Sequence, residues 1–200
     1  MKYLPLALIY SRLAIGGLLV ALSCRGVAHF AALAVGLLTL GVLTDVFDGI
    51  VARQLNISSE KLRRLDSAVD QVFWGLVLVA TYLAWPGFFA QNAAKLWTLL
   101  GLEGLTYAVS YLKFRKEIAT HSWGAKGWVL VSAAALIQIL STGNSGLLFN
   151  ISFYLGVLSR VEIIAILLLL PRWTNDVPTC YHALRLRRNQ PIRRYKLLNG

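Results

Sequence analysis

Three long stretches of this chain of 200 residues contain no charged side chain, and this feature most constrains how it can fold. No Asp, Glu, Lys or Arg occurs in residues 26–44, 71–94 or 127–159. A helix needs roughly 20 apolar residues to cross a bilayer, so the first two stretches can each cross once and the third almost twice. Charged residues make up only 14% of the chain, against about 25% in an average domain, too few to cover a soluble fold. We therefore expect an integral membrane protein.

The apolar segments predict an all-α, polytopic membrane protein with six transmembrane helices. The expected helices cover about residues 4–23, 27–53, 62–85, 94–112, 127–140 and 149–170. Breaks are expected at Pro86-Gly87, over residues 142–146 and at Pro171, because Pro and Gly end helices. Residues 1–24 are interpreted as a retained first helix and not as a signal peptide.

One membrane domain, residues 1–171, and a basic tail, residues 172–200, are expected. The chain carries 20 Lys and Arg against 9 acids, and cytoplasmic loops favour Lys and Arg. With both termini on one side, that side holds 17 basic residues and the opposite side only Arg25 and Lys95. Both termini are thus predicted to be cytoplasmic, in a plasma membrane or a bacterial inner membrane, and the basic charge requires no nucleic acid.

Four of the nine acids gather in one short part of the sequence. Asp45 and Asp48 are three residues apart in the second expected helix, and Asp66 and Asp70 are four apart in the third. Each spacing places two side chains on one helix face, and a reversal at residues 56–59 would bring the pairs together near the cytoplasmic boundary. Uncompensated carboxylates are unfavourable there, and divalent cations with oxygen ligands remove the problem. The pattern predicts a metal site; the alternative is a set of independent surface aspartates.

Residues 45–70 resemble the signature of the CDP-alcohol phosphotransferases, membrane enzymes that make phospholipid head groups. That signature is D-x2-D-G-x2-A-R-x8-G-x3-D-x3-D, and the chain matches seven of its eight fixed positions. Leu62 replaces the second glycine. This departure leaves open a family member that binds nucleotide or lipid without turnover. A divalent-cation transporter is the alternative from another class, although its acids would lie nearer the membrane midplane.

The resemblance implies an enzyme of phospholipid biosynthesis. It would transfer a phosphatidyl-type group from a CDP-alcohol lipid, with CDP-diacylglycerol as the expected donor, to the hydroxyl of a small polar alcohol, and release CMP. Two Mg²⁺ ions, or Mn²⁺ in their place, would be held by Asp45, Asp48, Asp66 and Asp70. Asp70 would also take the proton of the acceptor, in an active site facing the cytoplasm. A homodimer is implied as well. The residues implied in donor binding are Gly49, Ala52, Arg53, Leu62 and Arg12.

Charged residues outside the signature are candidates for choosing the acceptor. They are Lys113, His121, Lys126 and Arg160. The preference for cytoplasmic Lys and Arg explains the two lysines equally well. Arg160 lies inside the last expected helix, where it can pair with Glu103 or Glu162 or face the acceptor. Basic groups at the site would favour inositol phosphate or glycerol phosphate over serine or choline.

Overall fold

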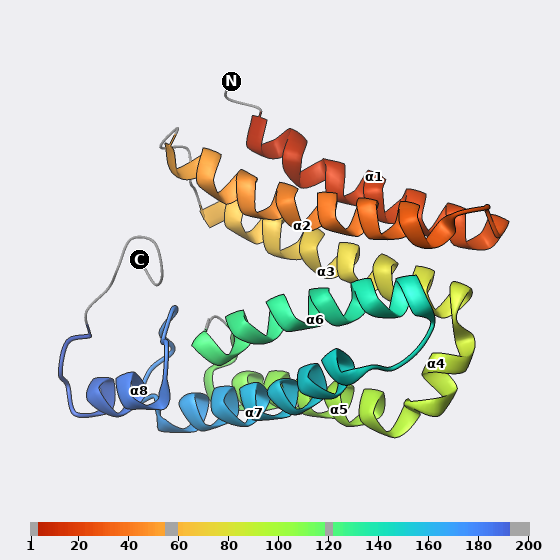
Figure 1. Cartoon of the computed structure of the whole chain (residues 1–200). Coiled ribbons are helices and arrows are strands. Elements are labelled where there is room, and N and C mark those ends of the chain that lie inside the picture. The colour runs from red at the N-terminus through yellow and green to blue at the C-terminus, as the bar shows by residue number, and fades with distance from the viewer. Residues whose placement is uncertain (1–3, 55–59, 119–121, 193–200) are drawn as a thin grey trace. The chain divides into compact units, whose positions relative to one another are not determined.

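The structure is a computed structural model that describes residues 4–54, 60–118 and 122–192. The side chains of residues 49, 52–54, 60, 61, 63 and 64 lie outside this description. Every regular element in the described ranges is a helix (Figure 1), so the all-α prediction is confirmed. The reversal expected at residues 56–59 falls outside the described residues.

Six of the described helices are long and two are short. The long helices are α1 (Leu4–Arg25), α2 (Phe30–Gln54), α3 (Glu60–Ala84), α5 (Ala93–Phe114), α6 (Trp123–Thr142) and α7 (Leu147–Leu169). The short helices are α4 (Pro86–Gln91) and α8 (Cys180–Arg187). The break at Pro86 is confirmed, because α3 ends two residues before it and α4 begins on it. Helix α8 lies in the basic tail, where the sequence indicated no helix.

Five helices of the described chain are long and apolar enough to cross a membrane. These candidate spans are α1, Phe30–Asp48 of α2, Leu65–Ala84 of α3, α6 and α7. The protein is therefore a multi-pass membrane protein. Helix α5 is not among the candidates, and it carries three charged residues. The six crossings expected from the sequence are thus confirmed only in part.

The chain forms two compact units, and the first holds Met1–Gln91 together with Leu136–Ser145. In this unit α1 packs against both α2 and α3, and Figure 1 shows the three helices lying lengthwise together. Their shared core contains Ile15, Leu19, Ala34, Leu38, Phe73, Val77, Ala80 and Leu140. Helix α1 is therefore the element that links α2 to α3.

Two glycines allow these helices to approach closely. A Cβ atom on Gly16 of α1 would lie 2.8 Å from Leu76 of α3. One on Gly41 of α2 would lie 2.4 Å from the ring of Phe73, also on α3. Small residues at helix contacts bring backbones together inside membranes, where packing drives helix association. Gly16 thus lets α1 approach α3, and Gly41 leaves room for the ring of Phe73 against α2.

The second unit holds Asn92–Ala135 and Gly146–Gly200. Helix α7 packs against α5 along its length and against α8 near its end. A Cβ atom on Gly156 of α7 would lie 2.7 Å from both Leu99 of α5 and the indole nitrogen of Trp128. Ile166 and Leu170 form a small apolar core with Val177 and Ala183, which holds α8 against the end of α7. The tail therefore begins as an ordered part of this unit.

All three charged residues of α5 find partners on α7. Lys95 Nζ donates to Asn150 Oδ1 (2.5 Å), Arg160 Nε donates to Glu103 Oε2 (2.8 Å), and Lys113 Nζ donates to the carbonyls of Leu167 (2.9 Å) and Leu168 (2.7 Å). The last pair satisfies carbonyl groups that the end of a helix leaves without an intrahelical partner. The pairing compensates all three charges of α5.

Candidate functional site

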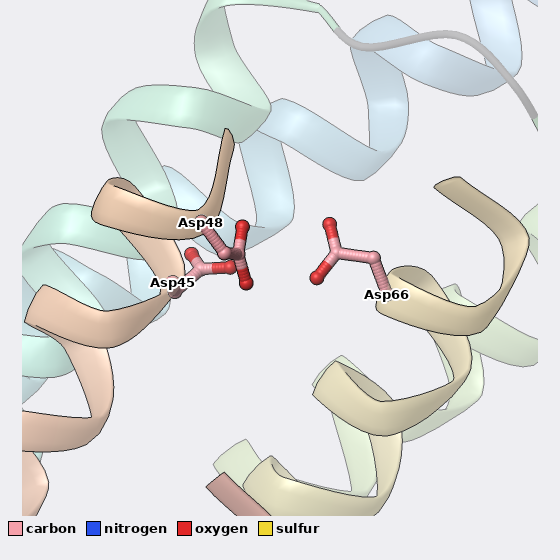
Figure 2. Close-up of side chains that lie close together, drawn as sticks. All are labelled: Asp45, Asp48 and Asp66. Carbon is pink, nitrogen blue, oxygen red and sulfur yellow. The ribbon is translucent and has the colours of Figure 1, made fainter. Parts of the chain in front are cut away.

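Carboxylates from α2 and α3 converge in the first unit. Figure 2 shows Asp45 and Asp48 extending from α2 toward Asp66 on α3. One carboxylate oxygen of each lies within 4.8 Å of the others. Carboxylate oxygens are the ligands that Mg²⁺ and Mn²⁺ favour, so the donor set fits a hard divalent cation. These aspartates are not independent surface groups.

Arg12 of α1 contacts all four aspartates of the signature. Its Nη1 donates to Asp45 Oδ1 (2.7 Å) and to Asp70 Oδ1, and its Nη2 donates to Asp48 Oδ2 (2.5 Å) and to Asp66 Oδ1. One guanidinium thus joins the two aspartates of α2 to the two of α3. The planar fork of arginine suits this arrangement, because its donors are held in a fixed geometry.

The position of Arg12 follows from the buried face of α1. The buried residues of this helix include Ile9, Arg12, Ile15, Gly16 and Leu19, at spacings of three and four along one side. Since α1 packs against both α2 and α3, this face lies on the helices that carry the aspartates. Arg12 has no exposed surface, and a buried guanidinium requires opposite charge.

The two glycines of close approach lie within about one helical turn of this site. Arg12 precedes Gly16 by four residues, Asp45 follows Gly41 by four, and Asp70 precedes Phe73 by three. Residues so spaced lie on the same side of a helix. The helix contacts and the polar cluster are therefore parts of one face, and the glycines hold the cluster at hydrogen-bonding distance.

The four carboxylates differ in their access to solvent. The side chain of Asp48 is 4% exposed, whereas those of Asp45, Asp66 and Asp70 are 45%, 31% and 30% exposed. A buried charge depends on its partners more than an exposed one does. Asp48 is therefore the member that most needs a cation beside it, and the other three can face an entering ligand.

The residues implied in donor binding are described only in part. Gly49, Ala52 and Arg53 belong to α2, but their side chains lie outside the described residues. Leu62 lies in the first turn of α3, four residues before Asp66, and is partly buried. Arg12 lies among the aspartates themselves, and its expected position near the phosphates of the donor stays a prediction.

A second polar group, in the second unit, surrounds Arg160 in α7. Arg160 is 8% exposed and pairs with Glu103, one of the two acids that the sequence offered. Its guanidinium carbon lies 3.6 Å from the centre of the Trp128 ring. Within the described part of the chain, Arg160 Nη1 is buried and has no hydrogen-bond partner. A buried donor in this state can bind an anionic ligand, because an unmade hydrogen bond costs free energy.

Sequence reasoning missed the part that Trp128 plays. The tryptophan lies close to the predicted start of the fifth segment, which is the place of an interfacial aromatic residue. In the structure it is partly buried, beside both Gly156 and Arg160. A tryptophan two residues after Lys126 is the signal in the sequence, and it does not identify the arginine as its partner.

The other acceptor candidates occupy different surroundings. Lys113 binds the last carbonyl groups of α7, so its ammonium group already has a structural task. Lys126 is exposed in the first turn of α6. His121 lies outside the described residues. Arg160 and Lys126 therefore lie in the same unit.

These observations define a class: an all-helical, multi-pass membrane protein with carboxylates gathered from two helices. The chain belongs to the CDP-alcohol phosphatidyltransferase family, because the model of that family matches residues 2–170. This is a family of transferases that act in phospholipid head-group transfer. The family recognised in residues 45–70 is thus confirmed, and it extends over most of the chain.

The curated relative that the chain resembles adds no activity. It is an uncharacterized protein of Aquifex aeolicus (strain VF5), 30% identical over 113 residues. The match covers 54% of this chain and 57% of the relative, so the chain spans little more than half of that protein. No solved structure matches the chain.

Proposed function

We propose that this protein transfers a phosphatidyl-type group from a CDP-alcohol, with CDP-diacylglycerol as the donor, to the hydroxyl group of a polar alcohol. CMP is the second product. The observation that carries the proposal is the convergence of Asp45, Asp48 and Asp66, whose ligand oxygens lie within 4.8 Å of one another. Membership of the family supplies the class of reaction.

The three converging aspartates would hold divalent metal, with Asp70 as the fourth carboxylate of a two-ion site. Mg²⁺ is the expected ion, and Mn²⁺ has the same preference for oxygen ligands. Bound metal would supply charge neutralisation for the diphosphate and for the departing CMP. Asp48 is the ligand whose burial makes the bound charge most necessary.

Asp70 is the proposed general base. It lies one turn after Asp66 on α3 and is 30% exposed, so an acceptor hydroxyl group can reach it. The acceptor O–H bond breaks as its proton passes to the Asp70 carboxylate. The acceptor oxygen then forms a bond to the phosphorus that carries the lipid, and the bond from that phosphorus to the CMP oxygen breaks. Positioning of the two substrates supplies much of the remaining acceleration.

The donor is proposed to lie along α2 beside the aspartates. Gly49 and Ala52 are small residues one turn apart that would let cytidine approach the backbone. Arg53 would bind phosphate oxygens, since its fork matches their geometry. Leu62 would border the same nucleotide, where the signature has a glycine.

An acceptor that carries phosphate is the proposed co-substrate, with inositol phosphate and glycerol phosphate as the two candidates. The support is the buried Nη1 atom of Arg160, which has no hydrogen-bond partner within the described residues. This atom belongs to a guanidinium group, which is always positively charged. Lys126, in the first turn of α6, and His121, which precedes that helix in the sequence, are proposed to assist. Lys113 is a weaker candidate because its ammonium group binds the end of α7.

We further propose six crossings, with α5 as the fourth, both termini in the cytoplasm and the active site at that face. Lys95 and Lys113 lie 18 residues apart on α5, a length of about 27 Å in a helix, close to the thickness of a hydrocarbon core. The charges of α5 are paired with α7, which lowers the cost of their insertion. A homodimer is proposed on the family resemblance alone.

The test is CMP release by the purified protein from CDP-diacylglycerol in mixed micelles with Mg²⁺. The acceptors are inositol phosphate, glycerol phosphate, inositol, serine and choline. Asp70→Asn should be inactive, and Asp176→Asn, at an aspartate outside the signature, should match the parent. Asparagine tolerates the left-handed backbone found at Asp176 (φ 54°), which makes it a matched control. CMP release from Asp70→Asn at the parent rate would refute Asp70 as the base.

Leu62 motivates one alternative, a family member that binds the nucleotide without turnover. Three results together would favour it. The parent would bind CDP in the presence of metal, it would release no CMP with any acceptor, and Leu62→Gly would restore release. Release with any one acceptor from the parent protein would exclude it and identify the co-substrate.

A further inference from the structure

We propose that Arg12 is the built-in counter-ion of the four aspartates and competes with divalent cations for them. Loading of the site would then require the guanidinium to leave the carboxylates. This inference rests on the proposed metal site, and it adds that the site carries its own competing cation. Arg12 is a positioning residue in this proposal, since it keeps the carboxylates assembled.

The competition follows from which carboxylates Arg12 contacts. It contacts one oxygen on each aspartate, and three of these carboxylates also converge to within 4.8 Å of one another. A guanidinium and a divalent ion held by the same carboxylates would be like charges a few ångströms apart. Such repulsion is appreciable even in bulk water and greater in a protein, where the dielectric constant is lower. Both cannot keep these contacts.

The balance of charge shows why an internal cation is useful. Arg12 and the four aspartates carry a formal charge of −3 in a part of the protein that adjoins the membrane. The guanidinium cannot lose its proton, so its compensation is permanent. Two divalent ions would change the total to +1, which suits a diphosphate that is itself negative. Metal and nucleotide should therefore bind together, with the phosphates accepting the hydrogen bonds that Arg12 gives up.

The burial of Arg12 adds an independent observation. The residue has no exposed surface, and within the described part of the chain its Nε atom is buried without a hydrogen-bond partner. The terminal nitrogens thus satisfy the aspartates while the third nitrogen remains unmatched. A side chain bound at one end only in this way can shift without breaking a bond at Nε, which is what displacement by metal requires.

The test measures Mn²⁺ affinity and thermal unfolding of the purified protein in detergent, with no substrate present. The variants are Arg12→Met, which removes the charge, and Arg12→Lys, which keeps the charge but cannot contact all four carboxylates. Arg160→Met removes another buried arginine with a single acidic partner and is the matched control. We expect about tenfold tighter Mn²⁺ binding by Arg12→Met, an intermediate effect for Arg12→Lys and an unchanged Kd for Arg160→Met.

Unfolding temperatures provide the second readout. Arg12→Met should unfold well below the parent in EDTA and recover most of the difference in saturating Mn²⁺, because the ions replace the lost charge. Arg160→Met should lose stability equally in both conditions. If Arg12→Met folds only when purified with Mn²⁺, that dependence supports the proposal. The Mn²⁺ affinity is then measured on Arg12→Lys.

The outcomes separate this inference from the proposed function. If the parent binds Mn²⁺ and both Arg12 variants bind it with the same or lower affinity, the proposed competition is wrong and the proposed metal site stands. Failure of the parent and all variants to bind Mn²⁺ would overturn the metal site and the inference together. Failure of CMP release with intact Mn²⁺ binding would remove the proposed reaction and leave the role of Arg12 standing.

Discussion

Arg160 stacks on Trp128, with the guanidinium carbon 3.6 Å from the centre of the ring. The stacking fixes the plane of the guanidinium, so that Nε donates to Glu103 while Nη1 stays buried. A cation over an indole is stabilised by the negative face of the ring, about 2 kcal/mol when desolvated. Trp128 and Glu103 thus orient Arg160. The direction of its Nη1 atom is set by these two residues before any ligand binds.

Removal of the Glu103 carboxylate should expose this dependence. Glu103→Gln and Arg160→Met should each destabilise the protein, by about 1–3 kcal/mol, because each leaves a partner without its opposite charge. The double variant should lose less than the sum of the two, since the residues are coupled. Thermal unfolding in detergent followed by tryptophan fluorescence measures all three. Additive losses would show that the ion pair makes no contribution of its own.

Asp70→Asn should lower CMP release by about 10²–10⁴-fold, the usual contribution of a general base. Metal-dependent binding of CDP should largely remain, because Asp45, Asp48 and Asp66 keep their oxygens. Equilibrium dialysis of labelled CDP with and without EDTA tests the binding, and a CMP assay tests the turnover. Loss of binding in proportion to turnover would assign Asp70 to the metal site instead of to proton transfer.

Leu62→Gly should leave CMP release unchanged or raise it, since the change restores the glycine of the family signature. The substitution removes a good helix former from the first turn of α3, at a cost of up to about 1 kcal/mol. Initial rates and unfolding temperature should be measured together, so that lost stability is not taken for lost catalysis. A large fall in rate for a protein that still folds would show that leucine is required.

The two cysteines should be labelled from opposite sides of the membrane. Cys24 is exposed near the end of α1, and Cys180 begins α8. The Cys180→Ser variant keeps only Cys24, and the Cys24→Ser variant keeps only Cys180. In sealed vesicles of known orientation, an impermeant maleimide should reach Cys24 only from the side that faces away from the cytoplasm in the cell. It should reach Cys180 only from the cytoplasmic side. Labelling of both variants from one side would refute the proposed topology.

Cys180 should also react slowly until the pH is raised. Burial, with a smaller contribution from the charge of Glu162, raises the pKa of the Cys180 thiol above its ordinary value. The thiolate is the reacting form, so less of it is present at neutral pH in the folded protein than in the unfolded chain. The labelling rate of the Cys24→Ser variant rises with pH as its remaining thiol, Cys180, ionises. The midpoint of this rise should lie at a higher pH in the folded protein than in SDS. Identical pH profiles would contradict the burial of this thiol.

The fold could be predicted where composition alone decides it. Runs of apolar residues without charge fixed the helices to within a few residues, and Pro86 marked the break after α3. Helix α8 was not predicted because it has only eight residues, lies in a basic tail and buries only Ala183. Its packing depends on Ile166 and Leu170 of α7, which sequence periodicity in the tail cannot show.

The gathering of the carboxylates could be predicted from the sequence, but the cation at their centre could not. The spacing of Asp45, Asp48, Asp66 and Asp70 predicted two pairs, each on one face of its helix. Such a prediction is possible because helical periodicity is local. The contact of Arg12 with all four was missed, since it depends on how α1 packs across two other helices. A clue existed, because a lone arginine in an apolar helix needs acids, and the aspartates were the largest group available.

The pairing of α5 with α7 has a consequence for how the protein is made. Helix α5 leaves the ribosome well before α7, so Lys95, Glu103 and Lys113 meet the insertion machinery before Asn150, Arg160 and the end of α7 exist. Unpaired charges oppose entry into lipid. On the proposed topology, in which α5 crosses the membrane, we expect α5 to enter the lipid fully only when α7 is available to pair with it. Its insertion would then lag behind its synthesis, and a nascent chain that stops after α6 should hold an incompletely inserted α5.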